Sequence, residues 1–227
     1  MSSGSMSSGP MTRIFLASRN AKKLGELERI LAPLVPGLRV VGLDAIDHYD
    51  EPVEDAPTFE GNALIKARAG FRASGLPTVA DDSGLCVDAL NGMPGVLSAR
   101  WGGRPKSDER NNQLLLDQLA DVPDERRGAH FTAAVAFVHA EGAGGEIVVE
   151  GRMDGHVLRE ERGEGGFGYD PLFVASATPD GRTSAELSVA EKDAISHRGV
   201  ALREIAPLVA AVLGPENGPE NAPTQDA

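Results

Sequence analysis

The sequence predicts an α/β fold built on a mixed β-sheet. In the first half of the chain, short apolar segments alternate with amphipathic segments of helical period. In the second half, two segments of alternating apolar and polar residues flank the glycine-rich stretch 142–145, which is typical of an antiparallel hairpin. With 227 residues, 41% of them hydrophobic, the chain is long enough to bury a core of ordinary size.

One domain is expected at residues 12–213. Residues 1–11 are rich in Ser and Gly and lack the apolar stretch of a signal peptide, so they are predicted to be a disordered leader or a vector-derived remnant. Residues 214–227 are rich in Pro, Asn and Glu and are predicted to form a disordered tail.

The first half is predicted to contain three strands and two helices. Apolar residues recur on one face between Leu24 and Leu31, which indicates an amphipathic helix that ends at Pro33. Thr58 suits an N-cap and Gly75 a C-terminal stop, so a second helix is expected between them. The expected strands are 13–17, 38–43 and 76–80, and the last leads directly into a turn at Asp81-Asp82-Ser83-Gly84.

The second half is predicted to contain a helix, a hairpin and two C-terminal helices. Ser107 is expected to cap a helix that runs to about residue 119. Ser188 and Glu191 have the spacing of a capping box, and Ser196 is expected to start the last helix. The expected strands are 131–139 and 146–150 in the hairpin, with shorter ones at 157–159 and 169–174.

The charge of the chain limits its partners. Its 34 Asp and Glu residues exceed its 22 Lys and Arg residues, for a formal net charge of −12. Nucleic acids and anionic membranes bind to basic surfaces, so neither is an expected partner. A small anionic substrate stays compatible, because it needs only a few local cations or a metal ion. The single cysteine, Cys86, excludes an intramolecular disulfide and favours a reducing, cytoplasmic setting.

The segment 18–23 joins the first predicted strand to the first predicted helix. A helix N-terminus presents free N–H groups and the positive end of the helix dipole, which suits a phosphate. Lys22 and Lys23 would lie in the first turn, where a cation is unfavourable unless an anion is bound. Taken alone, however, two lysines are more often part of a solvated helix surface.

The adjacent carboxylates Asp81 and Asp82 suggest a metal site. Two neighbouring carboxylates repel each other and lose hydration when partly buried, and a divalent cation removes that cost. Mg²⁺ prefers one or two carboxylates together with phosphates and water. One carboxylate could hold the metal while the other takes a proton from an attacking water. A solvated Asp-rich turn is the alternative. The acidic stretch 50–55 could supply a further ligand, or it could be a solvated loop.

Two further segments suit a nucleotide. Glycines on both sides of Phe167 leave its ring free to stack on a flat ligand, which is worth about 1–3 kcal/mol per base. A hydrophobic plug on a loop is the alternative. Lys192 could reach a phosphate, and Arg198 offers a fork of donors that suits a keto oxygen or a carboxylate. These residues, with His197, are also compatible with a charged helix surface.

Six segments, in the same order along the chain, resemble the inosine triphosphate pyrophosphatase family, also called dITP/XTP pyrophosphatases. The likeness covers about residues 13–210. The segments are 16–23, 58–63, 79–85, 92–95 with 98–100, 165–171 and 185–199.

The resemblance implies an elongated, twisted mixed sheet with flanking helices, and two lobes around a central nucleotide-binding cleft. It implies hydrolysis of non-canonical purine nucleoside triphosphates (ITP, dITP, XTP) to the monophosphate and pyrophosphate, which cleanses the nucleotide pool. It also implies Mg²⁺ as cofactor and a homodimer.

The resemblance assigns roles to matching positions. Asp82 is expected to be the general base and a metal ligand, and Glu54 a second metal ligand. The expected substrate contacts are Ser18, Arg19, Asn20, Ala21, Lys22 and Lys23 at the triphosphate, Ser83, the base-stacking segment Phe167, Gly168, Tyr169 and Asp170, then Lys192 at a phosphate and His197 with Arg198 at the base.

This chain departs from the family pattern in two places. The family often has Thr-Gly-Asn where this chain has Ser18-Arg19-Asn20, so an arginine replaces a flexible glycine. The family also often has Glu directly before the Asn that matches Asn62; here that position is Gly61, and Glu60 is assigned no catalytic role.

Two other functions stay open. A nucleotide sensor would bind a triphosphate without cleaving it, although the paired carboxylates argue against that. A related pyrophosphatase could instead clear modified pyrimidine nucleotides. For purines, donors from Arg198 would satisfy the 6-keto group of inosine or xanthine and would meet the 6-amino group of adenine as donor against donor.

Overall fold

A computed structural model describes residues 12–46, 49–140 and 142–214. The predicted leader and residues 215–227 of the predicted tail lie outside these ranges. Within them, no helix combines the length and apolar character that a bilayer crossing requires.

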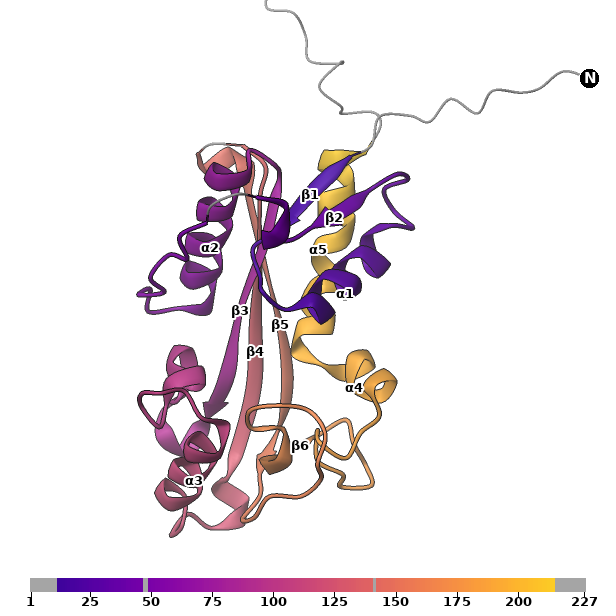
Figure 1. The fold of residues 1–227 in the computed structure, drawn as a ribbon. Coiled ribbons are helices and arrows are strands. Elements are labelled where there is room, and N and C mark those ends of the chain that lie inside the picture. The colour runs from indigo at the N-terminus through magenta and orange to yellow at the C-terminus, as the bar shows by residue number, and fades with distance from the viewer. Residues whose placement is uncertain (1–11, 47–48, 141, 215–227) are drawn as a thin grey trace, which may run out of the picture.

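The described strands form one six-stranded mixed sheet in the order β2-β1-β3-β4-β5-β6 (Figure 1). β1 (Arg13–Leu16) pairs in parallel with β2 (Arg39–Val41) and with β3 (Thr78–Val87). β4 (Gly128–Val138), β5 (Glu146–Val157) and β6 (Phe173–Ala175) continue the sheet with antiparallel pairing. The predicted mixed α/β fold is therefore confirmed, and the long central strands β3, β4 and β5 make the sheet elongated.

The helices cover both faces of this sheet. α1 (Ala21–Leu31) and α5 (His197–Leu213) pack on one face, and α2 (Phe59–Ser74) packs on the other (Figure 1). α3 (Asp108–Gln118) and α4 (Val189–Ile195) lie towards the opposite end of the long strands.

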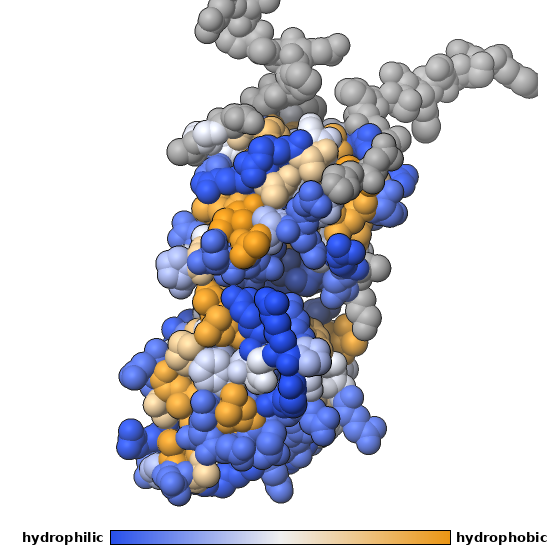
Figure 2. Space-filling view, turned by 60° about the vertical axis from the view of Figure 1, so that its left-hand side comes forward, coloured by the Kyte–Doolittle hydropathy of each residue, from blue (hydrophilic) through white to orange (hydrophobic). Residues whose placement is uncertain are grey.

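The apolar core is divided along the long strands, which gives the molecule two parts. At one end, Leu27 of α1 and Leu202 of α5 pack on the sheet, and an alanine-rich contact joins α2 to the other face. At the other end, Leu115 of α3 packs with Leu85 and Phe173. Figure 2 shows the surface indented between the two parts. This division agrees with the expected two lobes.

Local signals in the sequence located the helix ends well. Thr58 accepts a hydrogen bond from the backbone N–H of Gly61, and Gly75 ends α2 with φ of 64°. The capping box of Ser188 and Glu191 is present at α4, and Ser196 caps α5. Each of these contacts spans only a few residues, so the local sequence specifies it.

The largest correction concerns Asp81-Asp82-Ser83-Gly84, which is not a turn. The segment lies inside β3, where Asp81 pairs with Val135 and Asp82 with Ala134 of β4. The ladder to β4 extends the strand through residues of low β-propensity, because pairing and burial outweigh local preference.

Smaller corrections follow from the same long-range pairing. β5 runs without a break to Val157, so no separate strand exists at 157–159. The predicted strand 169–174 begins only at Phe173, after a 3₁₀ turn at Asp170–Leu172. The strand predicted at 38–43 is limited to Arg39–Val41.

Candidate active site

The two aspartates of β3 lie on opposite faces of the sheet, because successive side chains of a strand alternate between faces. Asp81 points towards α1 and α5, and Asp82 points towards α2. Each carboxylate therefore has its own set of partners, and the first partners of one are not those of the other.

Asp81 is a buried carboxylate between two cations. Its Oδ2 lies 2.6 Å from Nζ of Lys23, and its Oδ1 lies 3.6 Å from Nη2 of Arg198. Burial would raise the pKa of Asp81, but Lys23 and Arg198 outweigh it and hold the pKa well below its ordinary value. Asp81 therefore stays charged and is poorly suited to accept a proton.

The pKa of Asp82 is shifted in the opposite direction to that of Asp81. Asn62 donates to its Oδ2 at 3.0 Å, and Lys66 donates to its Oδ1 at 3.3 Å. Burial raises the pKa of Asp82, and the nearby Glu54 adds to this, while Lys66 and Asn62 offset only part of it. Asp82 is therefore the better proton acceptor of the pair.

Lys66 brings Asp82 and Glu54 together. Its Nζ donates to Oε2 of Glu54 at 2.8 Å as well as to Asp82. Burial would lower the pKa of Lys66, but the two carboxylates outweigh it and raise the pKa, so the ammonium group is charged. Two carboxylates thus converge on a single cation.

This convergence fits a divalent metal ion. Carboxylate oxygens are the protein ligands that Mg²⁺ prefers, and one or two of them suffice when phosphates and water complete the shell. Among the described residues, no three His, Cys, Asp or Glu side chains gather as ligands. A metal ion held by Glu54 and Asp82 would thus depend on oxygen atoms from elsewhere, such as a substrate.

Asn62 and Lys66 were not identified from the sequence. They lie four residues apart on α2 and therefore on the same helix face. Asn62 also accepts from the backbone N–H of Ala56 at 3.0 Å, and so fixes the loop that carries Glu54. The spacing of an amide and a cation after the N-cap Thr58 is a signal that could have revealed them.

The segment 18–23 connects β1 to α1, as predicted. Ser18 accepts the backbone N–H of Asn20 at 3.2 Å, and Arg19 makes an exposed ion pair with Glu51. α1 begins at Ala21 and has no acidic residue in its first turn. The side chains of Ala21 and Lys22 lie outside the described part of the chain. Lys23 connects this segment to Asp81.

The predicted base-stacking segment forms one cluster with Lys192. The Phe167 side chain is 75% exposed, and Nζ of Lys192 lies 4.9 Å from its ring centroid. Asp170 is buried and accepts from both the backbone N–H of Phe167 and Nζ of Lys192. Gly166 has φ of 76°, and a Cβ there would collide with Asp170. By contrast, the ring of Tyr169 is buried, and its hydroxyl donates to the Ser98 carbonyl at 2.9 Å.

His197 and Arg198 begin α5 beside β5. The His197 ring stacks on Phe131 with centroids 4.9 Å apart, and its Nδ1 is buried although the residue keeps some exposure. Burial, with a contribution from Lys192, lowers the pKa of His197 to about 3, so the ring is neutral near pH 7. Arg198 lies 3.6 Å from Glu26 as well as from Asp81. Ser83 is exposed on β3.

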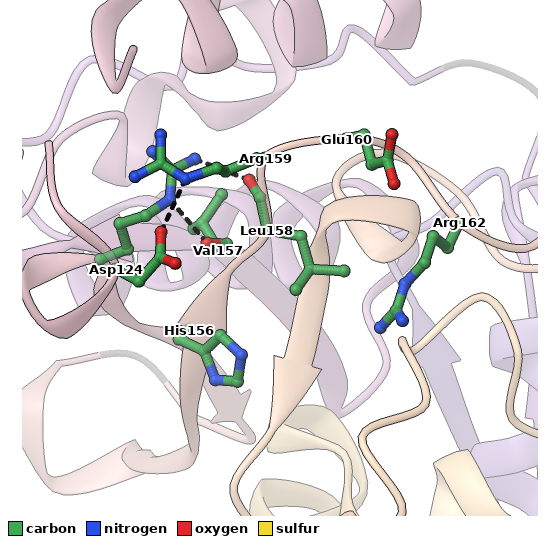
Figure 3. A pocket seen from close by; sticks show the side chains of 8 residues that line it. Asp124, His156, Val157, Leu158, Arg159, Glu160 and Arg162 are labelled. Carbon is green, nitrogen blue, oxygen red and sulfur yellow. Dashed lines mark hydrogen bonds and ion pairs between the residues drawn. The ribbon is translucent and has the colours of Figure 1, made fainter. Parts of the chain in front are cut away.

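A hollow of about 300 Å³ is lined by Arg127, His156 and Arg159, among others, and by none of the candidate site residues described above. Figure 3 shows side chains that line it. Arg127 and Arg159 already have partners within the protein. Arg127 donates to the carbonyls of Leu119, Val157 and Leu158, and Arg159 pairs with Asp124. These cations hold the end of α3 against the end of β5, which gives them a structural role.

Comparison with known proteins shows the family and the fold of this chain. The model of the Ham1 family matches residues 14–208. The dITP/XTP pyrophosphatase of Nocardia farcinica is 60% identical over 205 residues, which are 89% of this chain and 97% of that protein. The dITP/XTP pyrophosphatase of Corynebacterium diphtheriae is 56% identical over 202 residues, with 87% and 97% covered.

Solved structures show the same fold. The nucleoside-triphosphatase / dITP/XTP pyrophosphatase from Mycobacterium abscessus is 55% identical, with a TM-score of 0.73 over 86% of this chain and 100% of that one. A HAM1 protein from Coxiella burnetii is 37% identical, with a TM-score of 0.81 over 88% and 100%. The chain belongs to the Ham1 family.

Proposed function

We propose that this chain hydrolyses ITP, dITP and XTP to the monophosphate and pyrophosphate. The relatives from Nocardia farcinica and Corynebacterium diphtheriae are named dITP/XTP pyrophosphatase, and the match covers 97% of each of them. The structural observation that carries the proposal is the separation of the two aspartates: Asp82 shares a cation with Glu54, while Asp81 neutralises Lys23 and Arg198.

In this proposal, Asp82 takes a proton from a water molecule that attacks phosphorus. Of the two aspartates it is the better acceptor, because burial raises its pKa in the protein by itself whereas the pKa of Asp81 is lowered. Glu54 and Asp82 would hold Mg²⁺, whose charge would stabilise the pyrophosphate leaving group. Lys66 keeps both carboxylates in place. Its charge would also help neutralise a phosphate held at this metal site. Lys23 and Lys192 supply further cations for the triphosphate.

The base would lie between the exposed Phe167 ring and the start of α5. Nε and Nη2 of Arg198 are buried and make no hydrogen bond within the described part of the chain, although Nη2 lies 3.6 Å from Oδ1 of Asp81 in an ion pair. A buried donor without an acceptor, such as Nε, costs about 1–3 kcal/mol, so an acceptor on a ligand would relieve that cost. The 6-keto oxygen of inosine or xanthine is such an acceptor, whereas the 6-amino group of adenine is not.

A homodimer and a cytoplasmic setting complete the proposal. The dimer derives from the family resemblance, and the setting derives from the single cysteine.

A substrate panel tests the proposal. Pyrophosphate release should be measured with Mg²⁺ for ITP, dITP, XTP, GTP, ATP, dUTP and dCTP. We expect ITP, dITP and XTP to be cleaved at least about tenfold faster than ATP. This is the discrimination expected when one buried donor of Arg198 faces the 6-amino donor of adenine. Binding of ITP without pyrophosphate release would favour the nucleotide sensor, and faster cleavage of dUTP or dCTP would favour a pyrimidine-directed enzyme.

A further inference from the structure

The backbone of Gly168 is held by α3 through both its N–H and its carbonyl group. Its N–H donates to Oδ2 of Asp108 at 2.7 Å, and its carbonyl accepts from Nδ2 of Asn112 at 3.1 Å. Asp108 and Asn112 are four residues apart, so they lie on the same face of the helix. Asn112 also donates to Oε1 of Glu161 at 2.7 Å, and thereby joins the beginning of the 161–168 loop to its end.

This arrangement presents an exposed aromatic ring on a fixed backbone. Phe167 is 75% exposed, yet its own N–H is bound to Asp170, and the next two residues are anchored at Asp108, Asn112 and Ser98. Gly168 has φ of 60°, a conformation that favours glycine. Holding a loop in its binding conformation lowers the entropy lost when a ligand binds.

Stability alone does not account for Asn112. The residue is only 3% exposed, and its Oδ1 is buried without a hydrogen-bond partner in the described part of the chain. A buried carbonyl oxygen without a donor is destabilising, and a leucine of similar volume would avoid that cost. Glu161 is exposed and could return to water. What leucine could not do is hold the Gly168 carbonyl.

We propose that Asn112 and Asp108 are positioning residues that hold the Phe167 ring in place for stacking on the substrate base. The inference rests on the proposed function, in which Phe167 stacks on the base. It assigns to α3 a part in nucleotide affinity, although neither of its two side chains needs to touch the nucleotide.

The main test replaces Asn112 by leucine. We expect KM for ITP to rise about fivefold with kcat changed less than about twofold, because losing the hydrogen bond to the Gly168 carbonyl affects binding and leaves Asp82 and Lys66 in place. Tm should change by less than about 4 °C, because relief of the unpaired Oδ1 offsets most of the cost of the two lost hydrogen bonds. Amide hydrogen exchange of the 163–170 loop in the free protein should become faster. Gln113→Ala, on the exposed side of the same helix, is the matched control and should change none of these.

A pair of variants at Asp108 provides a second line of evidence if Asn112→Leu does not fold. Asp108→Asn keeps an oxygen that can accept from the Gly168 N–H and should behave like the parent protein, whereas Asp108→Ala should raise KM several-fold. An unchanged KM in Asn112→Leu or in Asp108→Ala, alongside a raised KM in Phe167→Ala, would overturn the positioning role. An unchanged KM in Phe167→Ala would instead overturn the stacking part of the proposed function.

Discussion

Replacing Asp82 by asparagine should abolish most of the activity while the fold persists. An amide does not accept a proton at neutral pH, so turnover of ITP should fall at least about 100-fold, which equals about 2.7 kcal/mol in activation free energy. The substitution leaves β3 and its pairing with β4 in place, because asparagine has the shape of aspartate.

The effect on stability can be worked out from the contacts. Asp82 accepts from Asn62 with one oxygen and from Lys66 with the other, and the single amide oxygen of asparagine can replace only one of these. Losing such a bond costs about 1 kcal/mol. In the opposite direction, the raised pKa of Asp82 means that burial already disfavours its charge, so removing the charge relieves that cost. The net change in Tm should be within about 4 °C.

The assay is pyrophosphate release from ITP with Mg²⁺, together with a thermal melt followed by circular dichroism. Asp81→Asn is the matched comparison. The lowered pKa of Asp81 means that its charge stabilises the folded state. Asp81→Asn should therefore lower the stability of the protein, while Asp82 stays available as the proton acceptor. Near-normal ITP turnover by Asp82→Asn would refute the assignment of Asp82 as the base. The parent enzyme should also lose kcat/KM as the pH falls and Asp82 becomes protonated.

Three further predictions follow from the contacts of the site and its support. Glu54→Gln should keep an acceptor for Lys66 but remove a charged metal ligand, so the Mg²⁺ concentration for half-maximal rate should rise at least about tenfold in a metal titration. Arg127→Met should leave three carbonyls without their donor and cost about 3 kcal/mol, or roughly 6–12 °C in Tm by calorimetry, while KM for ITP stays unchanged. His197 has a pKa of about 3 when folded and about 6.5 when unfolded, so its neutral form favours folding above about pH 6.5 and the advantage is lost as the pH falls towards 3. Denaturant unfolding should show about 1 kcal/mol less stability at pH 5.5 than at pH 7, and the difference should vanish in His197→Phe.

The sequence by itself determined features that depend on short distances along the chain. The N-caps at Thr58 and Ser196 and the capping box at Ser188 each involve a side chain and a backbone N–H within three residues, so the residue types alone predict them. Alternation of apolar and polar residues likewise predicted the hairpin of β4 and β5. The family resemblance rests on the order of such local motifs.

Only the tertiary structure decided how the acidic pair is divided. β4 lies about fifty residues after Asp81 and Asp82, and its hydrogen bonds to these residues make the segment a strand where the local sequence predicted a turn. The alternation of a strand then sends one carboxylate to Lys23 and Arg198 and the other to Asn62 and Lys66. Burial and neighbouring charge shift the two pKa values in opposite directions. Both the burial and the neighbouring charges depend on which helix packs on which face of the sheet, and the residues Asp81 to Gly84 do not by themselves specify that packing.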